Sequence, residues 1–199
     1  MKEHDKITAI CSLLNGFSDD DWQTLETVFE STKLWIPDMV YKFFDVVDHF
    51  LSSAGEYYPE TKNIKIRNSE EERFQIVQNW LTEILSGKPD DKYWQRIWLV
   101  GLVHVFHSIK PLYIIGIMSA IQNLFLANCN SAFEKELSEK IFAAFKRITD
   151  TTAACIIESN IYGLTRGMLM VGMNESLINN IKTNAVKRLI KEQRSQLEQ

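Results

Sequence analysis

The chain has 199 residues, of which 45% are hydrophobic and 24% charged, a composition that suits one soluble globular domain with an appended segment. Its formal net charge of −4 argues against a nucleic-acid-binding protein, which usually presents a basic face. Only 8 glycines and 4 prolines are spread over the chain, and few stretches alternate with period two, which favours an all-helical domain over a sheet protein.

The first third of the chain predicts two helices after a short N-terminal segment. Residues 1–17 are predicted as an arm or short helix. Ser18 is a typical N-cap, followed by three aspartates where a helix dipole favours anions, and predicts a helix to about Lys33. Pro37 fits the first turn of a helix over about 37–52. The polar stretch 52–68 is predicted as a loop.

The central and C-terminal thirds predict four more helices. Ser69 and Glu72 form a capping box that opens a helix to about Ser86, where Gly87 ends it. A helix over about 90–109 follows, and Pro111 opens the next, over about 111–128, because proline cannot continue a helix. A further capping box, Ser131 with Glu134, predicts a long helix through about residue 170.

The tail after Asn174 differs from the rest of the chain. Leu177, Ile181, Ala185 and Leu189 recur every four residues within a stretch rich in Lys, Arg, Glu and Gln. Two interpretations fit this pattern: the start of a coiled-coil linker, and a solvated terminal helix that frays.

The cysteine pattern and the apolar segments bear on location. Cys11, Cys129 and Cys155 are widely spaced and match no zinc-binding spacing, so reduced thiols in a cytoplasmic protein are expected. The N-terminus lacks the apolar region of a secretory signal. Polar residues and a proline interrupt the longest apolar region, 97–126, and no membrane span is expected.

His104 is the most informative residue, because it lies within an apolar helical run and seven residues before Pro111. A histidine in such a place must pair its ring nitrogens internally or bind something, since burial without a partner costs free energy. A satisfied core histidine is the alternative to a ligand.

Several short motifs around His104 resemble those of the sensor globins, the family of protoglobins and of the haem domains of globin-coupled sensors. In that family the pattern is roughly G-x-x-D-D-x-[FY], then G-x-x-H, then P-x-W-Y-x-G. The matching residues here are Gly87, Asp90, Asp91, Tyr93, Gly101, His104, Pro111, Tyr113 and Gly116. The resemblance covers about residues 18–165 and rests on the agreement of these spacings with the helix order.

The resemblance implies an all-α, globin-like fold that lacks the fourth helix and has an extra N-terminal helix and a C-terminal helical tail. It divides the chain into 1–17, a sensor-globin domain over 18–170, and a tail or linker over 171–199. It also implies that His104 is the proximal ligand of a b-type haem, iron protoporphyrin IX. His107, one helical turn later, is the rival ligand, and the spacing to Pro111 favours His104.

The gas-binding side departs from the family pattern. Sensor globins usually place a tyrosine second in a Phe-Tyr pair, where this chain has Phe43-Phe44, and often have a small polar residue where it has Ile76. Because bound O₂ benefits from a hydrogen-bond donor, the resemblance implies weaker O₂ retention and relatively better binding of CO or NO. Tyr41, one turn before Phe44, is an alternative donor if it points inward.

Four further residues are candidates for the cofactor pocket. They are Val77, Trp80, Val100 and Tyr113. Plain core packing is the alternative for each of them.

The function expected from these observations is a haem-based globin domain that binds O₂, CO or NO and signals through helices of a homodimer. A C-terminal output domain or a separate signalling partner is implied by the resemblance. The alternative is a globin-fold interaction module without haem. An enzyme is not expected, because the sequence has no convincing Ser/His/Asp or carboxylate–metal pattern, although a haem redox side activity is possible.

Overall fold

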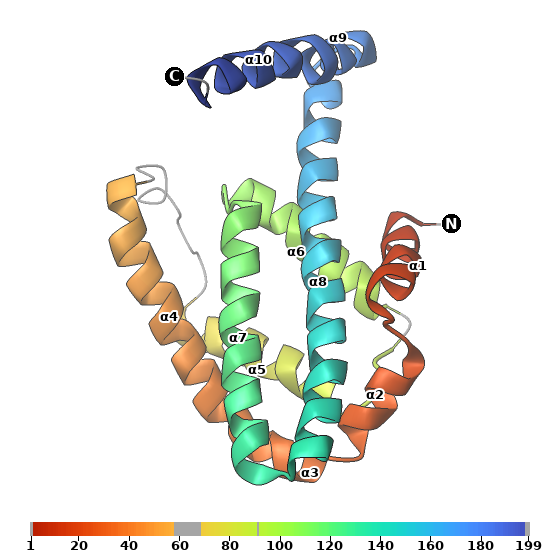
Figure 1. The fold of residues 1–199 in the computed structure, drawn as a ribbon, viewed down its shortest axis with the longest axis vertical. Helices are drawn as coiled ribbons and strands as arrows, with labels where there is room; N and C mark the ends of the chain where they lie inside the picture. Colours follow the sequence, from red (N-terminus) through yellow and green to blue (C-terminus); the bar gives the residue numbers. More distant parts are fainter. Residues whose placement is uncertain (1, 58–68, 91, 198–199) are drawn as a thin grey trace. The chain divides into compact units, whose positions relative to one another are not determined.

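The computed structural model describes residues 2–57, 69–90 and 92–197, and all regular structure in them is helical, as predicted (Figure 1). The elements are α1 (Glu3–Asn15), α2 (Asp19–Glu26), α3 (Phe29–Thr32), η1 (Lys33–Trp35), α4 (Ile36–Tyr57), α5 (Glu70–Leu85), α6 (Tyr93–Phe106), α7 (Pro111–Ala132), α8 (Lys135–Met170), α9 (Glu175–Asn180), the π-helical η3 (Ile181–Ala185) and α10 (Val186–Leu197). By its contacts the chain divides into two units, Met1–Asn160 and Ile161–Gln199.

The helix predicted from Ser18 begins as expected but ends early. Ser18 precedes α2, and its backbone N–H donates to the carboxylate of Asp21 at 3.0 Å. Val28 then leaves the helical region, with φ −114° and ψ 7°, and α3 and η1 carry the chain on to Trp35. The prediction of one continuous helix to Lys33 is therefore wrong.

Helix α4 is longer than predicted. It begins at Ile36, with Pro37 in its first turn, and continues to Tyr57. Residues 52–57, which were expected to be in a loop, are therefore helical. The remainder of that stretch, 58–68, where the absent fourth helix was expected, lies outside the described residues.

The signals at the two ends of α5 are confirmed. The Ser69 hydroxyl accepts from the Glu72 backbone N–H at 3.2 Å, and the Glu72 carboxylate accepts from the Ser69 N–H at 3.1 Å. Two backbone donors of the first turn are thereby satisfied. After α5 ends at Leu85, Gly87 has a φ of +119°, which side-chain-bearing residues rarely adopt.

The boundaries of α7 and α8 confirm one prediction and contradict another. Pro111 opens α7 as expected. Ser131 does not cap a helix, because it lies inside α7, where its hydroxyl donates to the carbonyl of Ala127 at 2.9 Å. Helix α8 begins later, at Lys135, and reaches Met170 as predicted.

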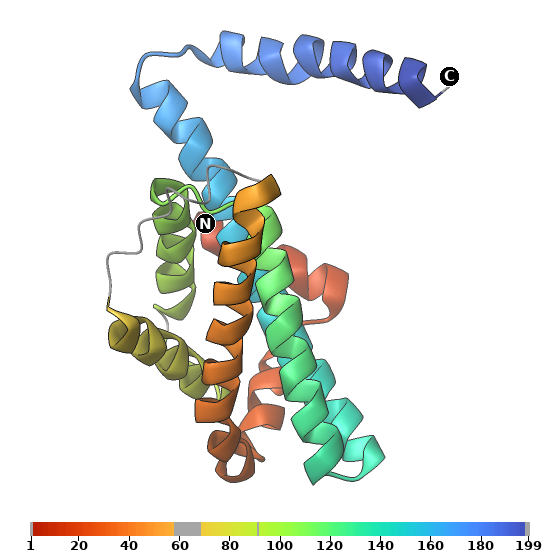
Figure 2. The same cartoon turned by 90° about the vertical axis from the view of Figure 1, so that its left-hand side faces the viewer.

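In the first unit, α4 lies beside α7 and also contacts α5, which crosses them (Figure 2). Helices α7 and α8 are joined by stacked rings of Phe125 and Phe145, with centroids 3.9 Å apart. A buried polar contact lies on the same interface, where the Gln122 amide donates to the Thr149 hydroxyl at 2.9 Å. The core of buried apolar residues lies at these interfaces and extends to α2, α5 and α6, where Trp22, Leu81 and Ile97 are buried.

Helix α6 lies against α8 at very short range. A Cβ built on Gly101 would lie 2.4 Å from the carbonyl oxygen of Ile156 and 2.7 Å from the Cβ of Ser159. Only glycine permits this approach of the two backbones. The Ser159 hydroxyl also donates to the carbonyl of Trp98, which holds α6 in register with α8.

Within the described part of the chain, α7 is the one helix long and apolar enough to cross a membrane by length and composition. A core helix of a globular fold meets the same criterion. Ile114, Ile121, Phe125 and Cys129 of α7 are buried, so one face of this helix packs in the core of the first unit.

The second unit continues the chain beyond Asn160 as the end of α8 followed by α9, η3 and α10. Gly172, with a φ of +93°, lies just beyond the end of α8. Asn174 caps α9 by accepting from the N–H of Leu177 at 2.7 Å. The predicted helical tail is thus confirmed, although its helix contains a π-helical segment.

Candidate functional site

His104 lies in the last turn of α6, three residues after Gly101. It is half-buried, and its Nδ1 atom is buried without a hydrogen-bond partner among the described residues. Burial, with a smaller contribution from nearby His107, lowers the pKa of His104 to about 4. The imidazole is therefore neutral at pH 7, and each neutral ring retains one nitrogen lone pair that can bind a metal.

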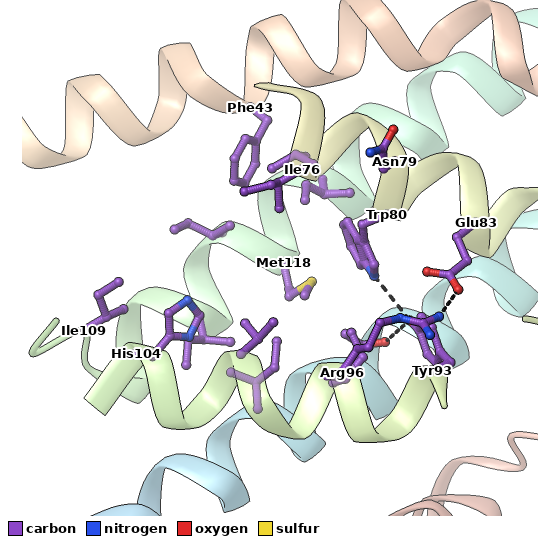
Figure 3. A pocket seen from close by; sticks show the side chains of 18 residues that line it. Phe43, Ile76, Asn79, Trp80, Glu83, Tyr93, Arg96, His104, Ile109 and Met118 are labelled. Carbon is purple, nitrogen blue, oxygen red and sulfur yellow. Dashed lines mark hydrogen bonds and ion pairs between the residues drawn. The ribbon is translucent and has the colours of Figure 1, made fainter. Parts of the chain in front are cut away.

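The side chain of His104 lines a cavity of about 540 Å³ between the helices of the first unit (Figure 3). Its walls come from α4, α5, α6, α7 and α8 and are mostly hydrocarbon. The lining residues are Phe43, Ile76, Val77, Asn79, Trp80, Glu83, Tyr93, Arg96, Ile97, Val100, His104, Ile109, Ile114, Ile117, Met118, Ile121, Thr152 and Ile156. The volume is within the roughly 300–1,000 Å³ usual for ligand and cofactor sites.

The polar groups of the cavity gather at the end remote from His104 (Figure 3). There the Trp80 indole N–H donates to the Tyr93 hydroxyl at 3.2 Å, and that hydroxyl lies 3.1 Å from the Thr152 hydroxyl. Because Thr152 in turn donates to the carbonyl of Ile148 at 2.9 Å, the Tyr93 proton goes to Thr152. These donors are already used within the protein.

Two charged residues lie at the same end. The Arg96 guanidinium pairs with the carboxylates of Glu83 and Asp90, the latter at 2.8 Å. The pairing lowers the pKa of Asp90 and raises that of Arg96. Burial raises the pKa of Tyr93 far above its usual value, so its hydroxyl stays neutral. The cavity therefore has one polar end and a histidine in an otherwise apolar region.

Six of the residues predicted from the sequence are brought together on this cavity. They are Phe43 from α4, Ile76, Val77 and Trp80 from α5, and Val100 and His104 from α6. Figure 3 shows the rings of Phe43, Trp80 and His104 around the same space.

Three other candidates lie elsewhere. The ring of Phe44 stacks on Phe74 with centroids 5.2 Å apart, and the Arg73 guanidinium lies 5.5 Å from it. Tyr113 is buried with its ring 4.6 Å from that of Phe50. Tyr41, considered as an alternative donor, is 68% exposed. None of these three lines the cavity.

The rival histidine, His107, is not part of the cavity wall. It follows the last residue of α6, and its ring lies 5.0 Å from that of Phe106. The rotation of about 60° between positions three apart on a helix accounts for the difference from His104.

Sequence reasoning missed the contribution of α7 and α8. The wall from α7 consists of Ile114, Ile117, Met118 and Ile121, and α8 adds Thr152 and Ile156. The spacings of three and four among these residues show one helix face each, but the sequence does not distinguish a face on a cavity from one on a filled core.

The sequence and the fold both match known globins. The model of the protoglobin family matches residues 4–158. The globin domain of a Geobacter sulfurreducens globin-coupled sensor superposes with a TM-score of 0.62 at 20% identity, over 76% of this chain and 95% of that one. No curated protein matches the chain. Since the family model spans most of the chain, including His104 and the cavity, this protein belongs to the protoglobin family.

Proposed function

We propose that the chain is a haem-binding globin domain in which His104 ligates the iron and a diatomic gas is the signal. The observation that carries the proposal is a neutral imidazole on the wall of an apolar cavity, with one buried nitrogen that has no partner among the described residues. Membership of the protoglobin family supports a binding domain and not an enzyme.

The residues present fit a b-type haem on three counts. The cavity volume of about 540 Å³ is that of a cofactor site, and its wall is largely aliphatic and aromatic. Imidazole is a common axial ligand of haem iron. Within the part of the chain that the structure describes, the buried Nδ1 of His104 lacks a partner, which is unusual for a histidine whose only role is packing. A bound haem would supply an iron atom with a coordination position for O₂, CO or NO.

In this proposal each wall of the cavity has its own part. His104 on α6 holds the iron, while Val100 from the same helix and Met118 and Ile117 from α7 exclude water. Phe43, Ile76 and Val77 bring only hydrocarbon from α4 and α5. Because O₂ gains more than CO from a hydrogen-bond donor, we propose a preference for CO or NO over O₂.

The same geometry supports a route from the cavity to α8. Tyr93, Val100 and His104 lie on α6, which contacts α8 through Gly101 and through the Tyr93–Thr152 hydrogen bond. A shift of α6 on ligand binding would therefore displace α8, because the two helices are already in close contact at Gly101. We propose that α7 and α8 form a homodimer interface and that an output domain or separate partner receives the signal.

The visible absorption spectrum tests the proposal. We expect the purified chain, or the haem-free chain after addition of haemin, to show a strong Soret band, and we expect the reduced form to change its spectrum with CO and NO. His104→Ala removes the axial ligand, so the band shifts and weakens. His107→Ala is the matched control and leaves the spectrum unchanged. A colourless chain that takes up no haemin would contradict the proposal and favour an interaction module without haem.

A further inference from the structure

Helix α10 is the dark blue helix of Figure 1. Its sequence places exposed apolar residues along one stripe. Val186, Leu189 and Ile190 are 43%, 57% and 48% exposed. Their spacings of three and one place them within about 100° of one another around the helix axis. Residues of this size and spacing normally face another surface.

The rest of α10 is strongly cationic. Residues 186–197 contain four cations, Lys187, Arg188, Lys191 and Arg194, against one carboxylate, Glu192, although the whole chain has a net charge of −4. All four cations are exposed, and none forms an ion pair with the described part of the chain. On a helix with about 100° per residue, Arg194 and Lys187 lie next to the apolar stripe, and Lys191 and Arg188 lie farther from it.

A second copy of α10 is a poor match for this surface. If Ile190 is assigned to an a position of a heptad, Lys187 and Arg194 fall on e positions, and the g positions are Leu189 and Gln196. A parallel pair of such helices would bring the cations of one copy opposite no carboxylate of the other. The cations of α10 therefore favour an anionic partner, and its apolar stripe favours a partner with an apolar surface.

An anionic lipid bilayer offers both properties at one surface. Its headgroups attract lysine and arginine, and its acyl chains accept an apolar stripe. We propose that α10 lies along an anionic membrane surface, with Val186, Leu189 and Ile190 toward the acyl chains and the four cations among the headgroups. The helix lies on the bilayer and does not span it, because four of the 12 residues of α10 are cations, which the hydrocarbon core of a bilayer excludes.

Co-sedimentation of the full chain with vesicles tests this inference. We expect binding to vesicles of phosphatidylcholine with phosphatidylserine, and at least about tenfold weaker binding to phosphatidylcholine alone, since the attraction per cation is substantial. Raising the salt concentration should weaken the binding to anionic vesicles, because screening reduces the attraction. Equal binding to both vesicles, or none to either, overturns the proposal.

Two pairs of variants assign the binding to α10. Leu189→Gln with Ile190→Gln, and Lys187→Gln with Lys191→Gln, should each reduce binding to anionic vesicles about tenfold or more. The matched controls are Leu13→Gln with Leu14→Gln, which are exposed apolar residues of α1, and Lys135→Gln with Lys140→Gln on α8. The controls should bind vesicles like the wild type. If they lose binding equally, α10 is not the site.

Sedimentation velocity without vesicles tests the remaining alternative, in which a second copy of the chain covers the apolar stripe of α10. If the α10 variants dissociate a dimer while vesicles bind neither them nor the wild type, α10 contacts a second copy and the proposal fails. The haem spectrum of each variant is independent of this outcome, because α10 contributes no residue to the cavity.

Discussion

At the scale of single residues, a partly buried ion pair joins the N-terminal part of the globin unit to α8. The Asp21 carboxylate, 4% exposed, accepts from Arg147 Nε at 3.0 Å and from its Nη2 at 2.6 Å, and it also accepts from the Ser18 N–H. The Asp21 carboxylate also raises the pKa of Arg147. One carboxylate thus caps α2 and joins it to a helix 126 positions away.

Removing the Arg147 side chain should lower the stability of the fold. In Arg147→Ala the Asp21 carboxylate stays buried with only the Ser18 N–H as a partner, so we expect a loss of about 2–3 kcal/mol in the free energy of unfolding, measured by urea denaturation. Lys146→Ala is the matched control, because Lys146 pairs with Asp150 at the surface, where such pairs contribute about 0.5 kcal/mol. Equal losses for both variants would mean that the Asp21 pair stabilises the fold no more than a surface pair does.

His104 shows the limit of inference from one residue. The sequence identifies a histidine in an apolar helix and its spacing to Pro111, and these are local features. Whether its nitrogens are paired depends on α5, α7 and α8, which come from distant parts of the sequence. The same holds for Phe43 and Phe44, since adjacent residues point to different neighbours and only packing determines which one reaches the cavity.

At the scale of elements, similar sequence signals have different outcomes. Ser69 and Ser131 each precede a glutamate by three residues, and both patterns predict a helix start. Ser69 caps α5, while Ser131 lies within α7 and donates to the carbonyl of Ala127. The residues before Ser131 already belong to α7, so its hydroxyl bonds within that helix and does not cap α8.

Alanine substitutions should separate these two serines. Ser69→Ala removes a cap and is expected to lower the free energy of unfolding by about 1 kcal/mol, measured by urea denaturation. Ser131→Ala should be neutral or slightly stabilising, because alanine is the best helix former in a helix interior. A loss at Ser131 as large as that at Ser69 would contradict the observed role of Ser131.

Helix boundaries were predictable where the backbone preference of a single residue determines them. Pro111 cannot continue a helix and begins α7, and Gly87 adopts a positive φ after α5 ends. Both predictions are confirmed, because each depends on the backbone of one residue. The break after Glu26 was not predictable. Val28 and Phe29 continue the apolar spacing of α2, and the change of direction there depends on how they pack in the core.

At the scale of the whole molecule, the cavity is a product of the complete globin unit. Five helices supply its walls, and the approach of α6 to α8 at Gly101 sets the position of the wall that carries His104. The walls of this space of about 540 Å³ are largely apolar, so a ligand that fills it would bury apolar surface and stabilise the folded chain.

Haemin should therefore stabilise the chain. At a free concentration of about 100 times its dissociation constant, a ligand that binds only the folded state adds about 2.7 kcal/mol, which raises the melting temperature of a domain of this size by roughly 5–10 °C. Thermal denaturation followed by circular dichroism measures the rise. In His104→Ala the rise should be much smaller at the same haemin concentration, while His107→Ala should match the wild type. A rise of equal size in His104→Ala would place the stabilising haemin on a surface other than the His104 cavity, because there the loss of the imidazole must weaken binding.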